Sequence, residues 1–266
     1  MKPLFILLMA FSVPFSTGAE PKLPVGYYDV AARKIPEMHI TRNVYFISGL
    51  AADERLFENL ALPTTYKIHH VKWIDPLKHE DLESYCHRLA AQIDTTAPFV
   101  LVGMSFGGMV AVELNKFLKP QQTILISSIA TRNGLSGFLK TVDLLHLHKL
   151  VPGFIYKNFY PAAHWFFNAH TKAQKKLVKS FMEKASRTLL VWSIDQVVGW
   201  RNEFIPKNIF IINGSADRVF PHKRTNANVL IKDGGHMMVH SKAAEISPVL
   251  ATQLAKVKWQ EAPVTN

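Results

Sequence analysis

Apolar residues along this chain gather in six short runs, each four to eight residues long. The runs cover residues 43–49, 66–73, 98–103, 122–127, 208–213 and 228–231. Most of them are nearly all apolar and do not alternate with polar residues, as strands buried on both faces do. Helical spacing of apolar residues appears between several of them, at 79–93 and 106–118, and again near the end of the chain at 243–255. This order predicts an α/β fold with a mostly parallel central sheet covered by helices.

The alternation of strands and helices breaks in the middle of the chain. Residues 130–200 contain no convincing strand and are rich in aromatic residues between 154 and 167. A helical pattern follows, from Ala173 to Leu189. We therefore predict a core made of residues 20–129 and 201–266, interrupted by a helical insert at residues 130–200.

Composition narrows the class of protein. Of 266 residues, 48% are hydrophobic and 19% are charged, which excludes a disordered chain. The single cysteine, Cys86, excludes an intrachain disulfide and a cysteine-rich zinc site. After the first twenty residues, no apolar run approaches the roughly 20 residues that span a bilayer.

The N-terminus has the features of a secretory signal peptide. Lys2 precedes the apolar run from Leu4 to Phe11, and the small residues Thr17 and Ala19 suit cleavage after Ala19. We predict that residues 1–19 are removed and that the protein is exported, to a bacterial periplasm or outside the cell. The alternatives are a membrane-bound N-terminus or a buried first strand, in which case the protein would be cytoplasmic.

Positive charge is concentrated in the predicted insert. The whole chain carries a net charge of +11, and residues 131–200 hold ten Lys and Arg against three Asp and Glu. Four of these cations share one flank of a predicted helix, with Ala173, Leu177, Phe181 and Met182 expected to pack inward: Lys172, Lys175, Lys176 and Lys179. This flank is either a solvated surface or one that attracts an anionic substrate or lipid surface weakly. No nucleic-acid-binding motif accompanies the charge, so no nucleic-acid partner is expected.

A candidate nucleophile lies between a predicted strand and a predicted helix. The segment Gly103-Met104-Ser105-Phe106-Gly107 matches the G-x-S-x-G nucleophile elbow. Gly103 and Gly107 lack Cβ atoms, so the strand and the helix can approach closely and lift the Ser105 hydroxyl above the sheet edge. The N–H of Phe106 lies at the helix N-terminus, where it can stabilise an oxyanion.

A serine hydroxyl needs a base, and the base needs an acid that orients it. His236 lies just after the last predicted strand in Gly234-Gly235-His236, where a loop can bring its imidazole over the sheet edge. Asp217 follows the strand at 208–213 and is the expected acid, whereas Asp233 is too close in sequence to turn back to His236. Six of the other eleven histidines are weaker candidates, on a strand (His69, His70) or on predicted helices (His79, His87, His146 and His148).

These motifs resemble those of the α/β-hydrolase-fold serine hydrolases, in the capped group that contains small esterases, thioesterases and related lyases. The resemblance covers roughly residues 40–260 and implies that residues 130–200 are a cap inserted after the sixth strand of the family fold. It also implies that the N–H of Leu50 completes the oxyanion hole. Where the family usually has His-Gly-x, this chain has Ser48-Gly49-Leu50, so Ser48 is expected to take over the hydrogen bond of the missing histidine.

The resemblance predicts hydrolysis of a carboxylic ester or thioester, with Ser105, Asp217 and His236 as catalytic residues and no metal or organic cofactor. A lyase or a C–C bond hydrolase would use the same three residues, and a binding protein could keep the fold without catalysis. Because a binding role has no use for the three residues in this order, we favour an enzyme that acts on a small-molecule substrate.

Overall fold

The computed structural model describes residues 42–158 and 160–259, with the two side chains at 156 and 157 left out. The predicted signal peptide and its cleavage site lie outside the described residues. The described strands and helices are β1 (Arg42–Ile47), β2 (Tyr66–Val71), α1 (Leu82–Leu89), β3 (Phe99–Met104), α2 (Phe106–Leu114), β4 (Gln122–Ile126), α3 (Gly137–Leu144), α4 (Gly153–Asn158), α5 (Tyr160–Phe166), α6 (Lys172–Lys184), α7 (Arg187–Gly199), β5 (Ile209–Gly214), β6 (Val229–Ile231), α8 (Met238–Ser241) and α9 (Ala243–Lys256).

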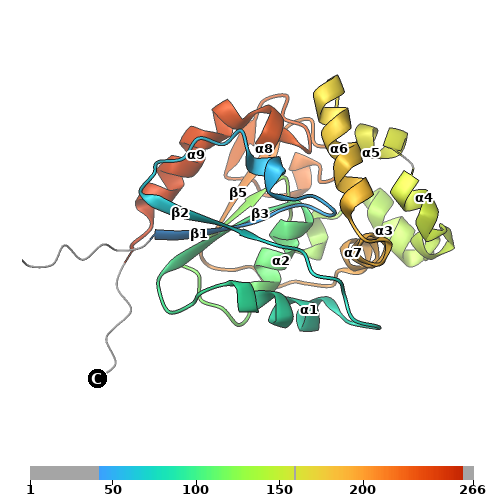
Figure 1. Cartoon of the computed structure of the whole chain (residues 1–266), viewed down its shortest axis with the longest axis horizontal. Coiled ribbons are helices and arrows are strands. Elements are labelled where there is room, and N and C mark those ends of the chain that lie inside the picture. Colours follow the sequence, from blue (N-terminus) through green and yellow to red (C-terminus); the bar gives the residue numbers. More distant parts are fainter. Residues whose placement is uncertain (1–41, 159, 260–266) are drawn as a thin grey trace, which may run out of the picture. The chain divides into compact units, whose positions relative to one another are not determined.

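The six described strands form one sheet in the order β2-β1-β3-β4-β5-β6, and all five pairings are parallel. Apolar side chains from both faces of the strands are buried. One face packs against α8 and α9, and the other packs against α1 and α2 (Figure 1). The predicted fold class, an α/β sheet covered by helices on both faces, is confirmed.

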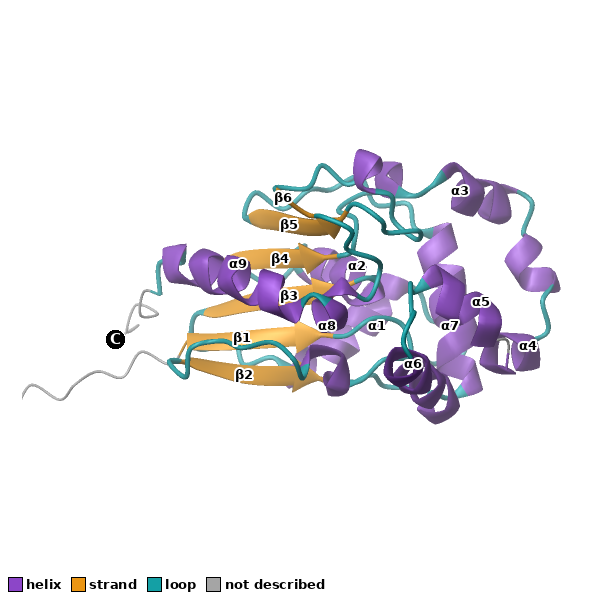
Figure 2. Ribbon diagram, turned by 90° about the horizontal axis from the view of Figure 1, so that it is seen from above, coloured by secondary structure: helices purple, strands orange, loops and turns teal. Residues whose placement is uncertain are grey.

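The helical insert lies between β4 and β5 and contains α3 to α7. In the family fold, six strands precede the cap, as the resemblance predicted. In the described part of this chain, the insert follows the fourth strand. The arrowheads of the strands point toward the insert, so its helices lie beyond the carboxyl edge of the sheet (Figure 2). Ligands of open parallel sheets bind at this edge.

Several local predictions were wrong because capping residues reset the helix boundaries. Asp81 accepts a hydrogen bond from the Ser84 N–H and begins α1, so His79 lies in the preceding turn with φ of 60°. The single helix expected from Ala173 to Leu189 is two helices, because Ser186 caps a new one, α7. The one helix expected to carry His146 and His148 is also interrupted, because His146 adopts a left-handed conformation after α3.

None of the helices in the described part of the chain is both long and apolar enough to cross a bilayer.

Candidate active site

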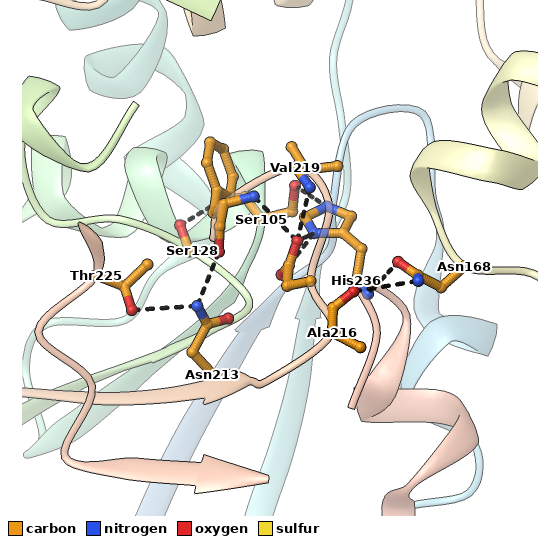
Figure 3. Close-up of polar contacts among 10 residues, drawn as sticks. Ser105, Ser128, Asn168, Asn213, Ala216, Val219, Thr225 and His236 are labelled. Carbon is orange, nitrogen blue, oxygen red and sulfur yellow. Dashed lines mark hydrogen bonds and ion pairs between the residues drawn. The ribbon is translucent and has the colours of Figure 1, made fainter. Parts of the chain in front are cut away.

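The structure places Ser105 in a sharp turn between β3 and α2. Ser105 has φ of 53° and ψ of −121°, an unfavourable conformation for a residue with a side chain. The turn is held by the Ser105 N–H, which donates to the Ile126 carbonyl at 3.0 Å, and by the Ser128 hydroxyl, which donates to the Ser105 carbonyl at 2.6 Å (Figure 3). Bonds from β4 and the residues just after it therefore stabilise the strained backbone that presents the Ser105 hydroxyl.

The glycines of the motif are required by close backbone packing. A Cβ atom on Gly103 would lie 2.4 Å from the Gly107 carbonyl oxygen, and one on Gly107 would lie 2.2 Å from the Ile47 carbonyl oxygen. Both distances are far below van der Waals contact, and the opposing atoms belong to the backbone. The predicted role of Gly103 and Gly107, to let the strand and helix approach, agrees with this geometry.

The structure brings Ser105, His236 and Asp217 together in one hydrogen-bonded row (Figure 3). The Nε2 atom of His236 is 2.8 Å from the Ser105 Oγ, and its Nδ1 atom lies 3.0 and 3.1 Å from the two Asp217 carboxylate oxygens. The side chains of His236 and Asp217 have no solvent exposure. Asp233, three residues before His236, is exposed.

The carboxylate of Asp217 is held from its own loop. One oxygen accepts hydrogen bonds from the N–H groups of Val219 at 2.9 Å and Phe220 at 3.0 Å. Asn213, at the end of β5, donates its side-chain amide to the Phe220 carbonyl at 2.9 Å. These bonds fix the orientation of the buried carboxylate toward the imidazole of His236.

The loop after β1 presents the N–H of Leu50 at the same edge. Ser48 donates its hydroxyl to the Ala52 carbonyl at 2.7 Å, and Trp73 donates its indole N–H to the Gly49 carbonyl at 3.1 Å. No acceptor in the described residues binds the Leu50 N–H. The N–H of Phe106 is the first of α2 and has no acceptor within the helix. The Ser48 hydroxyl therefore braces this loop; that it replaces the hydrogen bond of the family's histidine stays a prediction.

A cavity of about 550 Å³ opens above Ser105. Its floor comes from the loops at the sheet edge, and its roof comes from the insert. Among the residues that line it, those with polar side chains are Ser105, Ser136, Arg218 and His236. The cavity therefore suits an apolar group that reaches the Ser105 hydroxyl. Cavities of this size are typical of small-molecule sites.

Sequence reasoning missed a connection between the insert and the site. Asn168, between α5 and α6, accepts a hydrogen bond from the His236 N–H at 3.1 Å and donates to the Ala216 carbonyl at 3.2 Å (Figure 3). The ring of Phe167 stacks on the His236 imidazole, with centroids 5.6 Å apart. Gly235 allows this approach, because a Cβ atom there would lie 2.4 Å from the Asn168 Cβ. In the sequence, Gly235 was the one available signal of this close approach, but it does not identify Asn168 as the residue that makes it.

The described residues offer neither a reactive cysteine nor a metal site beside Ser105, His236 and Asp217. Cys86 is buried in α1, and burial raises the pKa of its thiol well above the usual range, so it is not a reactive nucleophile. In the described part of the chain, no cluster of three or more His, Cys, Asp or Glu side chains could hold a metal ion.

The fold and the site together define an α/β protein with a serine elbow at the carboxyl edge of a parallel sheet. The sequence model of the Alpha/beta hydrolase family matches residues 49–249, which is most of the chain. The chain belongs to this family. Curated proteins give no significant match.

Solved structures of the same fold include several hydrolases. A hydrolase from Pseudomonas aeruginosa PA01 aligns with a TM-score of 0.61 at 12% identity, covering 80% of this chain and 90% of that chain. A candidate lipase (lip1) from Acinetobacter baumannii AYE aligns with a TM-score of 0.59 at 17% identity, covering 82% and 84%. A thermophilic esterase from Thermogutta terrifontis aligns with a TM-score of 0.57 at 15% identity, covering 81% and 90%. At these identities the likeness supports the fold alone.

Proposed function

We propose that this member of the family is a serine hydrolase that cleaves carboxylic esters or thioesters through an acyl-enzyme on Ser105. The observation that carries the proposal is the row of hydrogen bonds from the Ser105 hydroxyl through His236 to Asp217, at the floor of an apolar cavity. A buried serine, histidine and aspartate in this geometry form the arrangement that activates a hydroxyl for attack on a carbonyl carbon.

In the first half-reaction, the Ser105 Oγ attacks the carbonyl carbon while its proton moves to the His236 Nε2. The negative charge that develops on the carbonyl oxygen is stabilised by the N–H groups of Leu50 and Phe106. The tetrahedral intermediate collapses as His236 gives the proton to the departing alkoxide or thiolate. Asp217 keeps the Nδ1–H of His236 oriented and stabilises the positive imidazolium.

In the second half-reaction, His236 takes a proton from a water molecule, which attacks the acyl group on Ser105. The carboxylic acid leaves and the Ser105 hydroxyl recovers its proton from His236. These steps require no group outside the chain except the substrate and water. The apolar cavity roofed by the insert suits an apolar acyl or alcohol group rather than a charged one.

The proposal is tested with p-nitrophenyl esters of rising chain length and an acyl-CoA thioester. The wild-type protein should turn over at least one of them. Ser105→Ala should lower kcat by about 10³-fold or more, with the fold intact by circular dichroism. Ser84→Ala removes an exposed hydroxyl on α1, outside the cavity, and is the matched control that should turn over the substrate like the wild type. Equal turnover by Ser105→Ala and the wild type would overturn the proposal.

We also propose that the protein is exported after cleavage near Ala19. The support is the order of Lys2, an apolar run and small residues in the sequence. N-terminal sequencing of natively expressed protein should find a start near Glu20. A soluble protein that begins at Met1 would contradict export.

A further inference from the structure

The outer part of the insert carries an unusual number of exposed apolar side chains. Eight of the fourteen most exposed large apolar side chains in the described residues come from the segment 138–165. We use the name apolar tip for six of these residues, which belong to α3, α4 and the short helical turn between them. They are Phe138, Leu144, Leu145, Leu147, Leu150 and Phe154.

A large part of each of these side chains is exposed to solvent. Leu144 is 77% exposed, Leu150 is 75% exposed and Phe138 is 62% exposed. Soluble proteins rarely gather so many exposed large apolar side chains in one short segment unless the segment binds something. Helix α4 lies at the end of the insert away from the sheet in both views (Figures 1 and 2), and α3 lies at an outer edge of the insert in Figure 2. The apolar tip is therefore free to approach a large flat surface.

The charges of the same segment favour an anionic surface. Between residues 137 and 158 the one acidic residue is Asp143, which is buried and paired with Arg132 at 3.0 Å and with Arg201 at 2.8 Å. The lysines of this segment are Lys140, Lys149 and Lys157. The ammonium of Lys149 lies 3.9 Å from the carboxylate of Asp195 on α7, whose side chain is 42% exposed, so the lysines outnumber the one exposed acid beside them. Exposed apolar side chains with an excess of lysines are the combination that binds the interface of anionic bilayers.

The apolar tip is continuous with the cavity above Ser105. Phe138 and Ile155 are exposed to solvent, at 62% and 37%, and they also line the cavity. A surface that contacted the apolar tip would therefore lie beside the apolar lining of the cavity. By contrast, the lysine flank of α6 does not line the cavity, and Ala173 on that helix is exposed rather than packed inward as expected. The structure therefore favours α3 and α4, rather than α6, as the candidate contact surface.

We propose that the apolar tip docks this protein onto anionic phospholipid bilayers. Leu144, Leu150 and their neighbours enter the interface between headgroups and acyl chains, and Lys140, which forms no ion pair among the described residues, approaches the anionic headgroups. The docking does not depend on the proposed hydrolysis, because neither Leu144 nor Leu150 lines the cavity.

The test is cosedimentation of the full-length chain with vesicles, in the Ser105→Ala background so that no lipid can be hydrolysed. Vesicles of phosphatidylcholine with about one-third phosphatidylglycerol are compared with vesicles of pure phosphatidylcholine. We expect binding to the anionic vesicles, with at least a tenfold loss in the double variant Leu144→Asp/Leu150→Asp. The matched control is Leu77→Asp/Ile205→Asp, which changes residues 59% and 55% exposed outside the insert and should bind like its parent.

Three results would overturn the proposal. The first is the absence of binding to anionic vesicles by the parent protein. The second is equal binding by the parent and the Leu144→Asp/Leu150→Asp variant, which would place the binding on another part of the chain. The third is a dimer in analytical ultracentrifugation that this variant dissociates, which would make the apolar tip an interface between two copies. A circular dichroism spectrum and a thermal unfolding curve like those of the parent show that the double variant folds.

Discussion

The floor and the roof of the cavity are built in different ways. The floor consists of loops at the carboxyl edge of the sheet, and its polar groups are buried and held by hydrogen bonds from neighbouring loops, as for Asp217 and His236. The roof comes from the insert and contributes mostly apolar side chains, several of them exposed. If the proposed hydrolysis is correct, we expect the floor to set the rate of the reaction and the roof to set which molecules bind.

The two parts meet at Asn168. This residue belongs to the insert, but its side chain bonds both loops of the floor, at Ala216 and His236. Its neighbour Phe167 accepts a hydrogen bond from the Met237 N–H at 3.2 Å through its carbonyl. The roof is therefore expected to affect the rate through the contacts that Phe167 and Asn168 make with the floor, and to affect binding through the residues that line the cavity.

The largest effect on kcat is expected from a substitution in the floor of the cavity. Asp217→Asn should lower kcat on the order of 10³- to 10⁴-fold with a small change in KM, because an amide no longer holds the His236 tautomer that accepts the Ser105 proton. The matched control is Asp233→Asn, which changes an exposed acid three residues from His236 and should leave kcat unchanged. Steady-state kinetics on the best p-nitrophenyl ester measure both. A comparable loss in the control would mean that the acid is misassigned.

A smaller effect is expected where the roof meets the floor. Asn168→Ala removes both hydrogen bonds and should lower kcat about tenfold, because small displacements of a catalytic group slow the reaction. Asn168→Asp can still accept from the His236 N–H and should recover part of the loss. Asn133→Ala, an exposed residue before α3, is the control. If Asn168→Ala raised KM alone, Asn168 would belong to the binding surface instead.

The smallest effect on rate is expected in the roof itself. Ala162 on α5 lines the cavity, so Ala162→Phe should raise KM several-fold for long-chain esters while leaving kcat for short-chain esters near the wild-type value. Ala173→Phe places the same ring on an exposed position of α6 and should change neither constant. A drop in kcat for all chain lengths would show that the roof and floor are not separable in this way.

Much of the floor could be predicted from the sequence, because its residues follow from local rules. The strands are continuous apolar runs, Ser105 lies in a motif that a strand enters and a helix leaves, and the order Ser105, Asp217, His236 follows the order of strand ends. The sequence also allowed an interpretation of Ser48, which stands where the family usually has a histidine. The oxyanion donor predicted for this loop is the backbone N–H of Leu50, so it does not depend on the side chain of either residue.

The roof could not be predicted to the same depth. Its helices have boundaries set by single caps such as Ser186, which a continuous apolar pattern hides. The role of Asn168 depends on a contact between residues 48 positions apart, from Asn168 to Ala216, and no local rule links them. The exposure of Leu144 and Leu150 is likewise a tertiary property, because the same spacing would suit a helix packed against the core.

The central claim is that Ser105 is an activated nucleophile, and covalent labelling tests it most directly. The wild-type protein is incubated with a fluorophosphonate, digested, and analysed by peptide mass spectrometry to locate the adduct. We predict one adduct per chain on Ser105, no adduct in Ser105→Ala, and much slower labelling in His236→Ala, since the hydroxyl then lacks its base. No adduct on the wild-type protein, or an adduct on another residue, would contradict the account.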